Sequence, residues 1–257
     1  MQKTILITGS TSGIGLGIAH EFAKTKQYNI IFNGLETNGQ EIADNVAKEF
    51  GIEVMYSNAN MLNPEELRKM VNDGISKFGK IDVLVNNAGI QHVSPIEDFP
   101  DDKWNAIIGI NLTSVFYLSK AVWAGMKERK FGRIINIASA HGLVASEFKS
   151  AYVASKHGIV GFTKTLGLEG APFNITCNAI CPGYVKTPLV EKQIADQAKA
   201  HNMSDADVVN KVMLLKQAVK EFVSVETIGQ MALLLAAEHS NTITGTAISI
   251  DGGWNAQ

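Results

Sequence analysis

The sequence predicts an α/β fold in which helices cover both faces of a doubly wound parallel sheet. Short apolar runs rich in β-branched residues recur along the chain, and each one ends in glycine or polar residues. These runs occupy residues 3–8, 28–32, 81–89, 132–139, 175–183 and 246–250. With 257 residues and 46% hydrophobic side chains, the chain can bury such a sheet on both faces as a single domain, 1–257.

The first run opens an element of the dinucleotide-binding type. Residues 3–8 lead directly into Gly9-Ser-Thr-Ser-Gly13-Ile-Gly15, and a helical pattern then places Ile14, Ile18 and Phe22 on one face. Such glycines let the backbone approach a pyrophosphate, which binds at the positive end of the helix. The spacing is Gly-x-x-x-Gly-x-Gly rather than Gly-x-Gly-x-x-Gly, but the strand, turn and helix context favours a Rossmann-type cofactor site over a plain loop.

The second run indicates which cofactor binds. It ends at Asn33-Gly34-Leu35-Glu36, where a side chain is expected to read the adenine ribose. A cation at this place favours the 2′-phosphate of NADP, and no lysine or arginine lies between Gly9 and Gly15 or between Asn29 and Gln40. The sequence therefore favours NAD. The acid expected for a free 2′-hydroxyl is missing at Asn33, and Glu36 comes late for that role.

The next three runs also end in polar or turn-forming residues. Asn86-Asn-Ala-Gly89, Ser139 and Pro182-Gly183 each follow an apolar run. In open α/β sheets, ligands bind outside the carboxyl ends of the strands. We therefore expect these residues to gather at the edge where the first glycine turn lies.

Ser139, Tyr152 and Lys156 form a candidate catalytic group. Tyr152 and Lys156 are four residues apart in a predicted helix, so they lie on one face. A tyrosine titrates near pH ~10, and lowering its pKa to about 7 needs about 4 kcal/mol. One cation at ~4 Å supplies about that much at an effective dielectric constant near 20. Lys156 is therefore expected to lower the pKa of Tyr152 and make it a general base; the alternative is a surface helix with a solvated lysine.

These motifs resemble the short-chain dehydrogenase/reductase family over essentially the whole chain. The matching stretches are Thr8-Gly-Ser-Thr-Ser-Gly-Ile-Gly15, Asn86-Asn-Ala-Gly89, Asn111, Ser139, Tyr152-x-x-x-Lys156 and Pro182-Gly-Tyr-Val-Lys-Thr187. The resemblance implies that the catalytic residues are Asn111, Ser139, Tyr152 and Lys156. It implies that the cofactor contacts Gly9, Thr11, Ser12, Gly13, Ile14, Gly15, Leu35, Asn60, Met61, Asn87, Ala88, Gly89, Tyr152, Lys156, Pro182, Gly183, Val185 and Thr187. Asn60-Met61 stands where the family usually has Asp and an aliphatic residue, so altered contacts to the adenine are expected.

Within this family, four stretches are similar to bacterial D-3-hydroxybutyrate dehydrogenases: residues 87–92, 96–100, 137–146 and 188–193. The similarity implies that the substrate, 3-hydroxybutyrate or acetoacetate, is bound by Gln91, Ser139, His141, Lys149, Tyr152, Gln193 and Trp254. A lysine, a histidine and two amides around one alcohol suit a small anion, because a steroid or a long acyl chain would need apolar walls. Each residue also has a structural interpretation, such as loop packing for His141 and carboxyl-terminal packing for Trp254.

The predicted reaction is reversible hydride transfer from D-3-hydroxybutyrate to NAD, which gives acetoacetate and NADH. Tyr152 takes the hydroxyl proton, Ser139 orients the reacting oxygen, and Asn111 holds a water that connects Lys156 to solvent. The alternatives are a 3-oxoacyl carrier-protein reductase, a dehydrogenase of another small hydroxy acid, and a non-catalytic NAD-binding protein. The missing cation near the ribose disfavours the first, and the complete catalytic set disfavours the last.

Two regions predict features beyond the sheet. Residues 184–222 are expected to form a small helical lid over the ligand edge, which carries Gln193 and a helix with Ser204 as its N-cap; the alternative is a static pair of helices. The helices around 105–126 and from Tyr152 onward carry more apolar residues than one face holds. Family members pair these helices across subunits, which implies a homotetramer; the alternative is extra burial within one subunit.

Composition disfavours several other classes. The net charge of −2 gives no electrostatic reason to bind nucleic acid or an anionic membrane. No apolar run is expected to approach membrane length, and no amino-terminal signal segment is recognised. Cys177 and Cys181 lie ~13 Å apart in one predicted strand, too far for a disulfide, which indicates reduced thiols and a cytoplasmic location. The six histidines are scattered, so no metal site is predicted.

Overall fold

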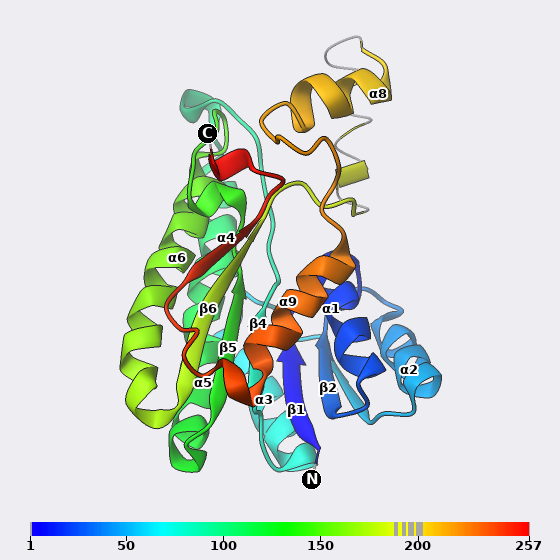
Figure 1. Cartoon of the computed structure of the whole chain (residues 1–257), viewed down its shortest axis with the longest axis vertical. Helices are drawn as coiled ribbons and strands as arrows, with labels where there is room; N and C mark the ends of the chain where they lie inside the picture. Colours follow the sequence, from blue (N-terminus) through cyan, green and yellow to red (C-terminus); the bar gives the residue numbers. More distant parts are fainter. Residues whose placement is uncertain (1, 188–189, 192–193, 195–197, 199–202, 257) are drawn as a thin grey trace.

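The computed structural model describes residues 2–187, 190–191, 194, 198 and 203–256. Its centre is a sheet of seven parallel strands in the order β3-β2-β1-β4-β5-β6-β7 (Figure 1). The strands are β1 (Lys3–Ile7), β2 (Tyr28–Asn33), β3 (Val54–Ser57), β4 (Val83–Asn86), β5 (Gly132–Ile137), β6 (Ile175–Pro182) and β7 (Ala247–Ile250). The chain passes from β3 at one edge back to β4 beside β1, so the strand order reverses there. Such a reversal opens a ligand crevice at the carboxyl ends of the strands.

Helices cover both faces of this sheet, as the sequence predicts. The larger helices are α1 (Gly13–Lys24), α2 (Gly39–Phe50), α3 (Pro64–Phe78), α4 (Asp101–Ile108), α5 (Ser114–Arg129), α6 (Ser150–Gly170) and α9 (Val225–Ala236). Alternate residues of β1 face opposite layers, because successive side chains of a strand point to opposite faces. Ile5 and Ile7 pack in a cluster with residues of α1, α2 and α9, whereas Leu6 packs with residues of α3, α5 and α6.

The strand β3 is absent from the runs that the sequence predicts. Its four residues, Val54 to Ser57, are all half-buried, and the strand lies at the edge of the sheet beside β2. A strand that is paired on one side needs no continuous apolar run, so its composition resembles a loop. The other six runs are strands, with bounds shifted by up to a few residues.

The apolar helix predicted around residues 105–126 is longer than the sequence suggested. Residues Asp101–Arg129 run through α4, a π-helical turn η2 (Gly109–Thr113) and α5 as 29 helical residues, with the length and composition of a membrane span. The expectation that no apolar run approaches this length is therefore wrong for this helix. Its inner face is accounted for by packing, because Leu118, Val122 and Met126 are buried against the sheet and α3.

The region after β6 rises above the carboxyl ends of the strands, where α8 (Asp205–Val208) stands at the top of Figure 1. Ser204 is the N-cap of α8, as predicted, because its hydroxyl accepts a hydrogen bond from the amide of Asp207 at 3.1 Å. Val208 and Met213 are buried in a small apolar cluster with Tyr184 and Phe222, separate from the clusters of the sheet. This region therefore has its own minor core.

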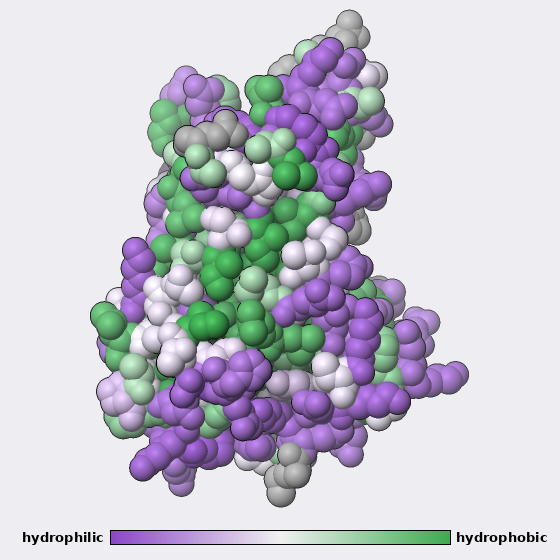
Figure 2. Space-filling model, in the orientation of Figure 1, coloured by the Kyte–Doolittle hydropathy of each residue, from purple (hydrophilic) through white to green (hydrophobic). Residues whose placement is uncertain are grey.

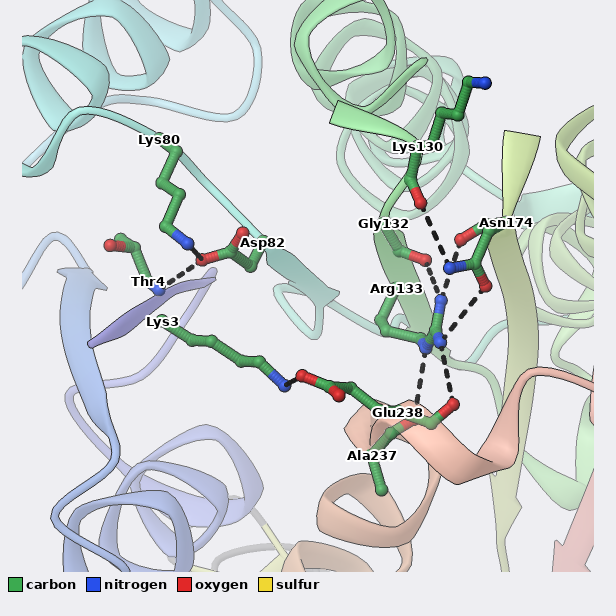
Figure 3. A network of polar contacts seen from close by, with 10 residues as sticks. All are labelled: Lys3, Thr4, Lys80, Asp82, Lys130, Gly132, Arg133, Asn174, Ala237 and Glu238. Carbon is green, nitrogen blue, oxygen red and sulfur yellow. Dashed lines mark hydrogen bonds and ion pairs between the residues drawn. The ribbon is translucent and has the colours of Figure 1, made fainter. Parts of the chain in front are cut away.

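A polar network ties the opposite edge of the sheet together, at the amino ends of the strands (Figure 3). The side chain of Arg133 is 1% exposed and donates hydrogen bonds to the carbonyl oxygens of Asn174 at 2.9 Å, Ala237 at 3.3 Å and Glu238 at 3.4 Å. The carboxylate of Glu238 in turn pairs with Lys3 at 2.9 Å. Burial lowers the pKa of Arg133. This arginine therefore links β5 to the ends of α9 and to the segment before β6, away from the ligand edge.

Candidate active site

A large cavity opens at the carboxyl ends of β1 to β4 and at the start of α1, with a volume of about 660 Å³. Two glycines of the first turn have a left-handed backbone, with φ of +59° at Gly9 and +54° at Gly13. A Cβ atom on Gly15 would lie 2.2 Å from the carbonyl oxygen of Gly9, so that position admits no side chain. The turn therefore leaves its backbone open to the cavity at a helix start, which fits the pyrophosphate of a dinucleotide.

Amide side chains of the neighbouring strands hold this glycine turn. The amide of Asn87 donates to the carbonyl oxygens of Thr8 at 2.8 Å and Gly9 at 2.9 Å. The side chain of Asn33 accepts from the backbone N–H of Gly9 at 3.2 Å and donates to the carbonyl oxygen of Ala59 at 3.0 Å. Asn33 is 2% exposed, so an acid at its position would bury a charge and lose the donors that the turn requires.

Glu36 supplies the carboxylate that Asn33 lacks. Its oxygens accept hydrogen bonds from the hydroxyls of Thr11 and Ser12, the latter at 3.4 Å, and Glu36 lines the cavity beside Gly34 and Leu35. Although burial opposes it, this hydrogen bonding lowers the pKa of Glu36. The carboxylate that comes late in the sequence therefore folds back to the glycine turn.

Most residues predicted to contact a cofactor do line this cavity. The lining includes Gly9, Ser12, Gly13, Ile14, Leu35, Asn60, Met61, Asn87, Ala88, Gly89, Tyr152, Lys156 and Thr187. The other predicted residues lie around it: Thr11 is buried against Glu36, Gly15 lies beneath Gly9, and Pro182 belongs to β6. Gly183 and Val185 line a second, smaller cavity instead. Asn60 is exposed, and its side-chain oxygen accepts from the backbone N–H of Leu62 at 2.9 Å.

The candidate catalytic residues come together beside both cavities. Ser139 follows β5, and its hydroxyl forms a hydrogen bond with Tyr152 of α6. The ammonium of Lys156 lies 5.6 Å from the centre of the Tyr152 ring and donates to the carbonyl oxygen of Ile137 at 2.7 Å. Burial lowers the pKa of Lys156 to about 8. The amine therefore keeps most of its positive charge at pH 7 and loses it as the pH rises through about 8.

Asn111 lies in the π-helical turn η2, a local widening often found at functional sites. Its side chain accepts from the backbone N–H of Ile90 at 2.9 Å and donates to the carbonyl oxygen of Ile90 at 2.9 Å. It also donates to the hydroxyl of Ser155 at 3.2 Å, one position before Lys156. Asn111 thus joins the loop after β4 to the helix that carries Tyr152.

The pKa of Tyr152 differs from what the sequence suggested. Burial raises it, and the hydrogen bond with Ser139 lowers it by less. The lower pKa expected from the sequence requires a full cation at ~4 Å from the phenol. In the folded chain the ammonium of Lys156 is bonded to Ile137 and its own pKa is lowered by burial. The protein groups alone therefore leave Tyr152 protonated at neutral pH.

The second cavity has a volume of about 150 Å³ and adjoins the first at Tyr152. It lies below the ~300–1,000 Å³ that is usual for sites of drug-sized ligands. Its walls include five residues predicted to bind the substrate besides Tyr152: Gln91, Ser139, His141, Lys149 and Trp254. Gln193 lies outside the described residues. The walls therefore combine a cation and polar groups around a space for a small molecule.

His141 and Lys149 have electrostatics typical of a buried polar pocket. Burial, with further contributions from Lys149 and Lys216, lowers the pKa of His141 to about 3, so its ring is neutral at pH 7. Its Nε2 lies 2.9 Å from the hydroxyl of Ser146 and its Nδ1 lies 3.5 Å from that of Ser139. Burial first, and then Lys216, lowers the pKa of Lys149. An anion in the pocket would offset both of these effects on Lys149.

Tyr184 is a wall of the pocket that sequence reasoning missed. Its ring stacks on Trp254, with centroids 5.8 Å apart, and the ammonium of Lys149 lies 5.7 Å from its centroid. The ring of His141 meets Trp254 edge to face at 5.1 Å. Tyr184 directly follows the Pro182-Gly183 turn at the ligand edge, and this position was the one feature of the sequence that could have indicated a place in the pocket wall.

Known proteins are similar in sequence to this chain over its full length. The family profile described as "short chain dehydrogenase" matches residues 3–198. Two curated relatives named "D-beta-hydroxybutyrate dehydrogenase" are similar: one from Rhizobium meliloti is 51% identical and covers 100% of both chains, and one from Cupriavidus necator is 49% identical and covers 99% of this chain and 98% of its own. A crystal structure of an actinorhodin polyketide ketoreductase variant with NADPH superposes with a TM-score of 0.93 at 31% identity, over 100% of this chain and 98% of the other. The chain therefore belongs to the short-chain dehydrogenase family, whose members are oxidoreductases that use a nicotinamide cofactor.

Proposed function

We propose that this oxidoreductase converts D-3-hydroxybutyrate to acetoacetate with NAD as the hydride acceptor. One observation carries the proposal: a cavity of about 150 Å³ with a lysine and a buried neutral histidine in its walls adjoins Ser139, Tyr152 and Lys156. The space suits a short molecule, and the lysine suits one that carries a carboxylate. The names of two relatives at about half identity over full length support the same substrate.

In this proposal Tyr152 takes the hydroxyl proton of the substrate. Ser139 forms a hydrogen bond with the same phenol and orients the alcohol oxygen against it. Lys156 stabilises the phenolate, and its ammonium is held by the carbonyl oxygen of Ile137. The nicotinamide supplies the hydride acceptor, and its positive charge when oxidised favours the phenolate that burial disfavours. A water held by Asn111 and leading from Lys156 to solvent remains a proposal.

The substrate carboxylate lies, in this proposal, against Lys149, with His141, Gln91 and Gln193 as neutral hydrogen-bond donors. A neutral histidine donates from one ring nitrogen, so His141 holds an anion without adding a buried charge. Tyr184 and Trp254 close the remaining wall as a stacked pair. The wall they form leaves little room for an acyl chain longer than that of a small hydroxy acid.

The choice of NAD over NADP rests on Glu36. Its carboxylate lines the cavity next to the first glycine turn, where a 2′-phosphate would meet a negative charge. Of the residues described along this cavity, Lys156 is the only one with a cationic side chain, and it lies at the catalytic end. We therefore place the ribose 2′-hydroxyl of NAD near Glu36.

A 3-oxoacyl or polyketide reductase is the second candidate, since the ketoreductase structure with NADPH shares the fold. That reaction would need room for a carrier-bound acyl chain and a cation for the 2′-phosphate. The small pocket leaves little room for such an acyl chain, and the carboxylate of Glu36 would repel a 2′-phosphate. Both features disfavour this second candidate.

The experiment that tests the proposal follows NADH absorbance with D-3-hydroxybutyrate and NAD, beside the L enantiomer and beside NADP. We expect turnover with the D form and NAD alone. Tyr152→Phe should abolish turnover with little change in NAD binding. Lys149→Met should raise the KM for the hydroxy acid, whereas Lys186→Met, at an exposed lysine paired with Glu191 near the same pocket, should not. Turnover of a 3-oxoacyl thioester with NADPH but not of the hydroxy acid would overturn the proposal in favour of the second candidate.

We further propose that the protein is a cytoplasmic homotetramer. Phe116 of α5 is 45% exposed and Leu168 of α6 is 79% exposed, and both lie on the two helices that the sequence marks as unusually apolar. Figure 2 shows a separate apolar band over the middle of one face, where Figure 1 draws β7 and α9, with polar residues on its flanks. Cys177 and Cys181 are free and buried in β6, which suits a reducing compartment. Analytical ultracentrifugation measures the oligomeric state directly.

A further inference from the structure

Gln217 is a fully buried amide that lines neither of the two cavities. Its side chain is 0% exposed, and it lies in the segment between the π-helical turn η5 (Val209–Met213) and α9. The residues that line the small pocket do not include it. A buried amide with no ligand contact is costly unless its hydrogen bonds are made, so its partners define its role.

Those partners belong to both ends of the segment that rises above the sheet. The Oε1 of Gln217 accepts from the backbone N–H of Tyr184 at 3.1 Å, at the point where the segment leaves β6. Its Nε2 donates to the carbonyl oxygens of Val219 at 3.3 Å and Glu221 at 2.9 Å, at the point where the segment returns to α9. One side chain therefore joins the exit of the segment to its return.

The same amide contacts the chain that leads to Trp254. A Cβ on Gly252, whose φ is +62°, would lie 2.9 Å from the Nε2 of Gln217, so the two are in close contact. The backbone N–H of Val219 also donates to the carbonyl oxygen of Gly252 at 2.9 Å. Gln217 thus lies where three stretches meet: residues 183–185 after β6, residues 219–223 before α9, and residues 251–254 after β7.

Two of these stretches supply the stacked wall of the small pocket. The backbone N–H of Tyr184 donates to the Oε1 of Gln217, and Trp254 follows Gly252 by two residues. A parallel bridge between Val185 and Val223, with the N–H of Val223 donating to the carbonyl oxygen of Tyr184 at 2.8 Å, supports the same junction. Because the tyrosine and tryptophan rings stack at 5.8 Å, a shift of either backbone changes the shape of the pocket.

We infer that Gln217 is a positioning residue that sets the affinity for the hydroxy acid by fixing Tyr184 and Trp254 against each other. The role requires one acceptor and two donors on a single neutral end group, which an amide has and a carboxylate or an alkyl group lacks. This inference deepens the proposed function and rests on its substrate.

Three variants test it. Gln217→Glu keeps an acceptor for Tyr184 and loses donors to Val219 and Glu221, and Gln217→Leu loses all three partners. Asn178→Leu is the matched control: Asn178 is a buried amide of β6 that donates to the carbonyl oxygen of Ile243 at 2.7 Å, and it lies ~13 Å from the carboxyl end of that strand. The control therefore loses its hydrogen bond to Ile243 and the one it accepts from the backbone N–H of Thr246 at 3.4 Å, without touching the pocket wall.

The readout is the KM for D-3-hydroxybutyrate against the KM for NAD in each variant, together with the melting temperature. We expect Gln217→Leu to raise the KM for the hydroxy acid by about tenfold or more. The KM of Gln217→Glu should lie between those of the wild type and Gln217→Leu, and the KM for NAD should stay nearly unchanged in both variants. Asn178→Leu should lower the melting temperature with both KM values unchanged. Equal changes in both KM values, or none in either, for the Gln217 variants would overturn the inference and leave Gln217 as a support of stability alone.

A second readout separates this inference from the proposed function. Amide hydrogen exchange at Tyr184 and Val223 is measured in the wild-type protein and the variants, without any substrate. We expect faster exchange at both amides in Gln217→Leu and not in Asn178→Leu. If the wild-type protein does not oxidise the hydroxy acid, the proposed function fails and the exchange data still decide the positioning role; unchanged exchange would overturn it.

Discussion

The ammonium of Lys156 donates to the carbonyl oxygen of Ile137 at 2.7 Å, which anchors a side chain of α6 to the last residue of β5. This hydrogen bond places a basic group at the carboxyl edge of the sheet and 5.6 Å from the ring of Tyr152. The sheet itself, rather than the helix alone, therefore fixes the distance between the lysine and the phenol.

Lys156→Met should remove the charge that stabilises a phenolate at Tyr152 while it keeps the length of the side chain. We expect kcat/KM to fall by about 10²–10⁴, the usual range for loss of acid–base assistance. Lys164→Met, at an exposed position two turns further along α6, serves as the control and should keep full activity. Steady-state kinetics measure kcat/KM for both variants. Equal activity in the two would contradict a catalytic role for Lys156.

The unfolding free energy should depend on pH through His141. Its folded pKa of about 3 lies below the ordinary 6.5, chiefly because of burial. Between these values the unfolded chain binds more protons, so stability rises with pH across this window and is lost as the pH falls through it. His141→Gln lacks this dependence. From pH 7 to pH 4 the stability of the wild type relative to the variant should fall by up to about 3 kcal/mol. Urea denaturation at several pH values measures the free energy of unfolding of both proteins. A difference between them that does not change with pH would contradict the low pKa of His141.

Phe148 precedes Lys149 with a φ of +62°, a left-handed backbone that a bulky residue rarely adopts. The N–H of Ser94 donates to the carbonyl oxygen of Phe148 at 2.9 Å and holds this conformation. Phe148→Gly should be more stable than Phe148→Ala by about 1 kcal/mol, because the glycine has no Cβ to strain. The alanine variant is the matched control for the lost ring. Denaturant midpoints compare the two, and equal stability would show that the left-handed backbone costs nothing there.

Arg133→Met should destabilise the fold without altering the site. The change removes the Arg133 donors from the carbonyl oxygens of Asn174, Ala237 and Glu238, of which the first two keep backbone donors at 3.3 Å from Gly132 and Ser240. We expect a loss of about 2–4 kcal/mol in the free energy of unfolding, because several hydrogen bonds of a buried charged group are lost together. Arg68→Met, at an exposed arginine paired with Glu65, should change stability little. Thermal and denaturant unfolding measure both. A KM change in Arg133→Met would reveal a coupling between the two edges of the sheet.

The sequence predicts the sheet well because most of its strands are buried on both faces and read as continuous apolar runs. β3 escapes prediction for the opposite reason, since its residues are all half-buried at the edge. The helix predicted around residues 105–126 is found, and the structure extends it at both ends to residues 101–129, so only its full length was missed.

The candidate site divides in the same way. The glycine turn, Ser139, Tyr152 and Lys156 are marked by residue types and spacings that few other chemistries require. No residue type or spacing predicts the junction at Gln217, because its role depends on three stretches, far apart in the chain, that meet at one amide. The pKa of Tyr152 is likewise invisible in the spacing, since burial decides its direction.

The two cavities share Ile14, Gln91, Tyr152 and Thr187 in their walls. A molecule that fills the larger cavity therefore contacts four side chains of the smaller one, and these common surfaces give the two binding equilibria a route for coupling. Thermodynamic reciprocity then requires that the hydroxy acid change the affinity for the cofactor by the same factor by which the cofactor changes the affinity for the hydroxy acid.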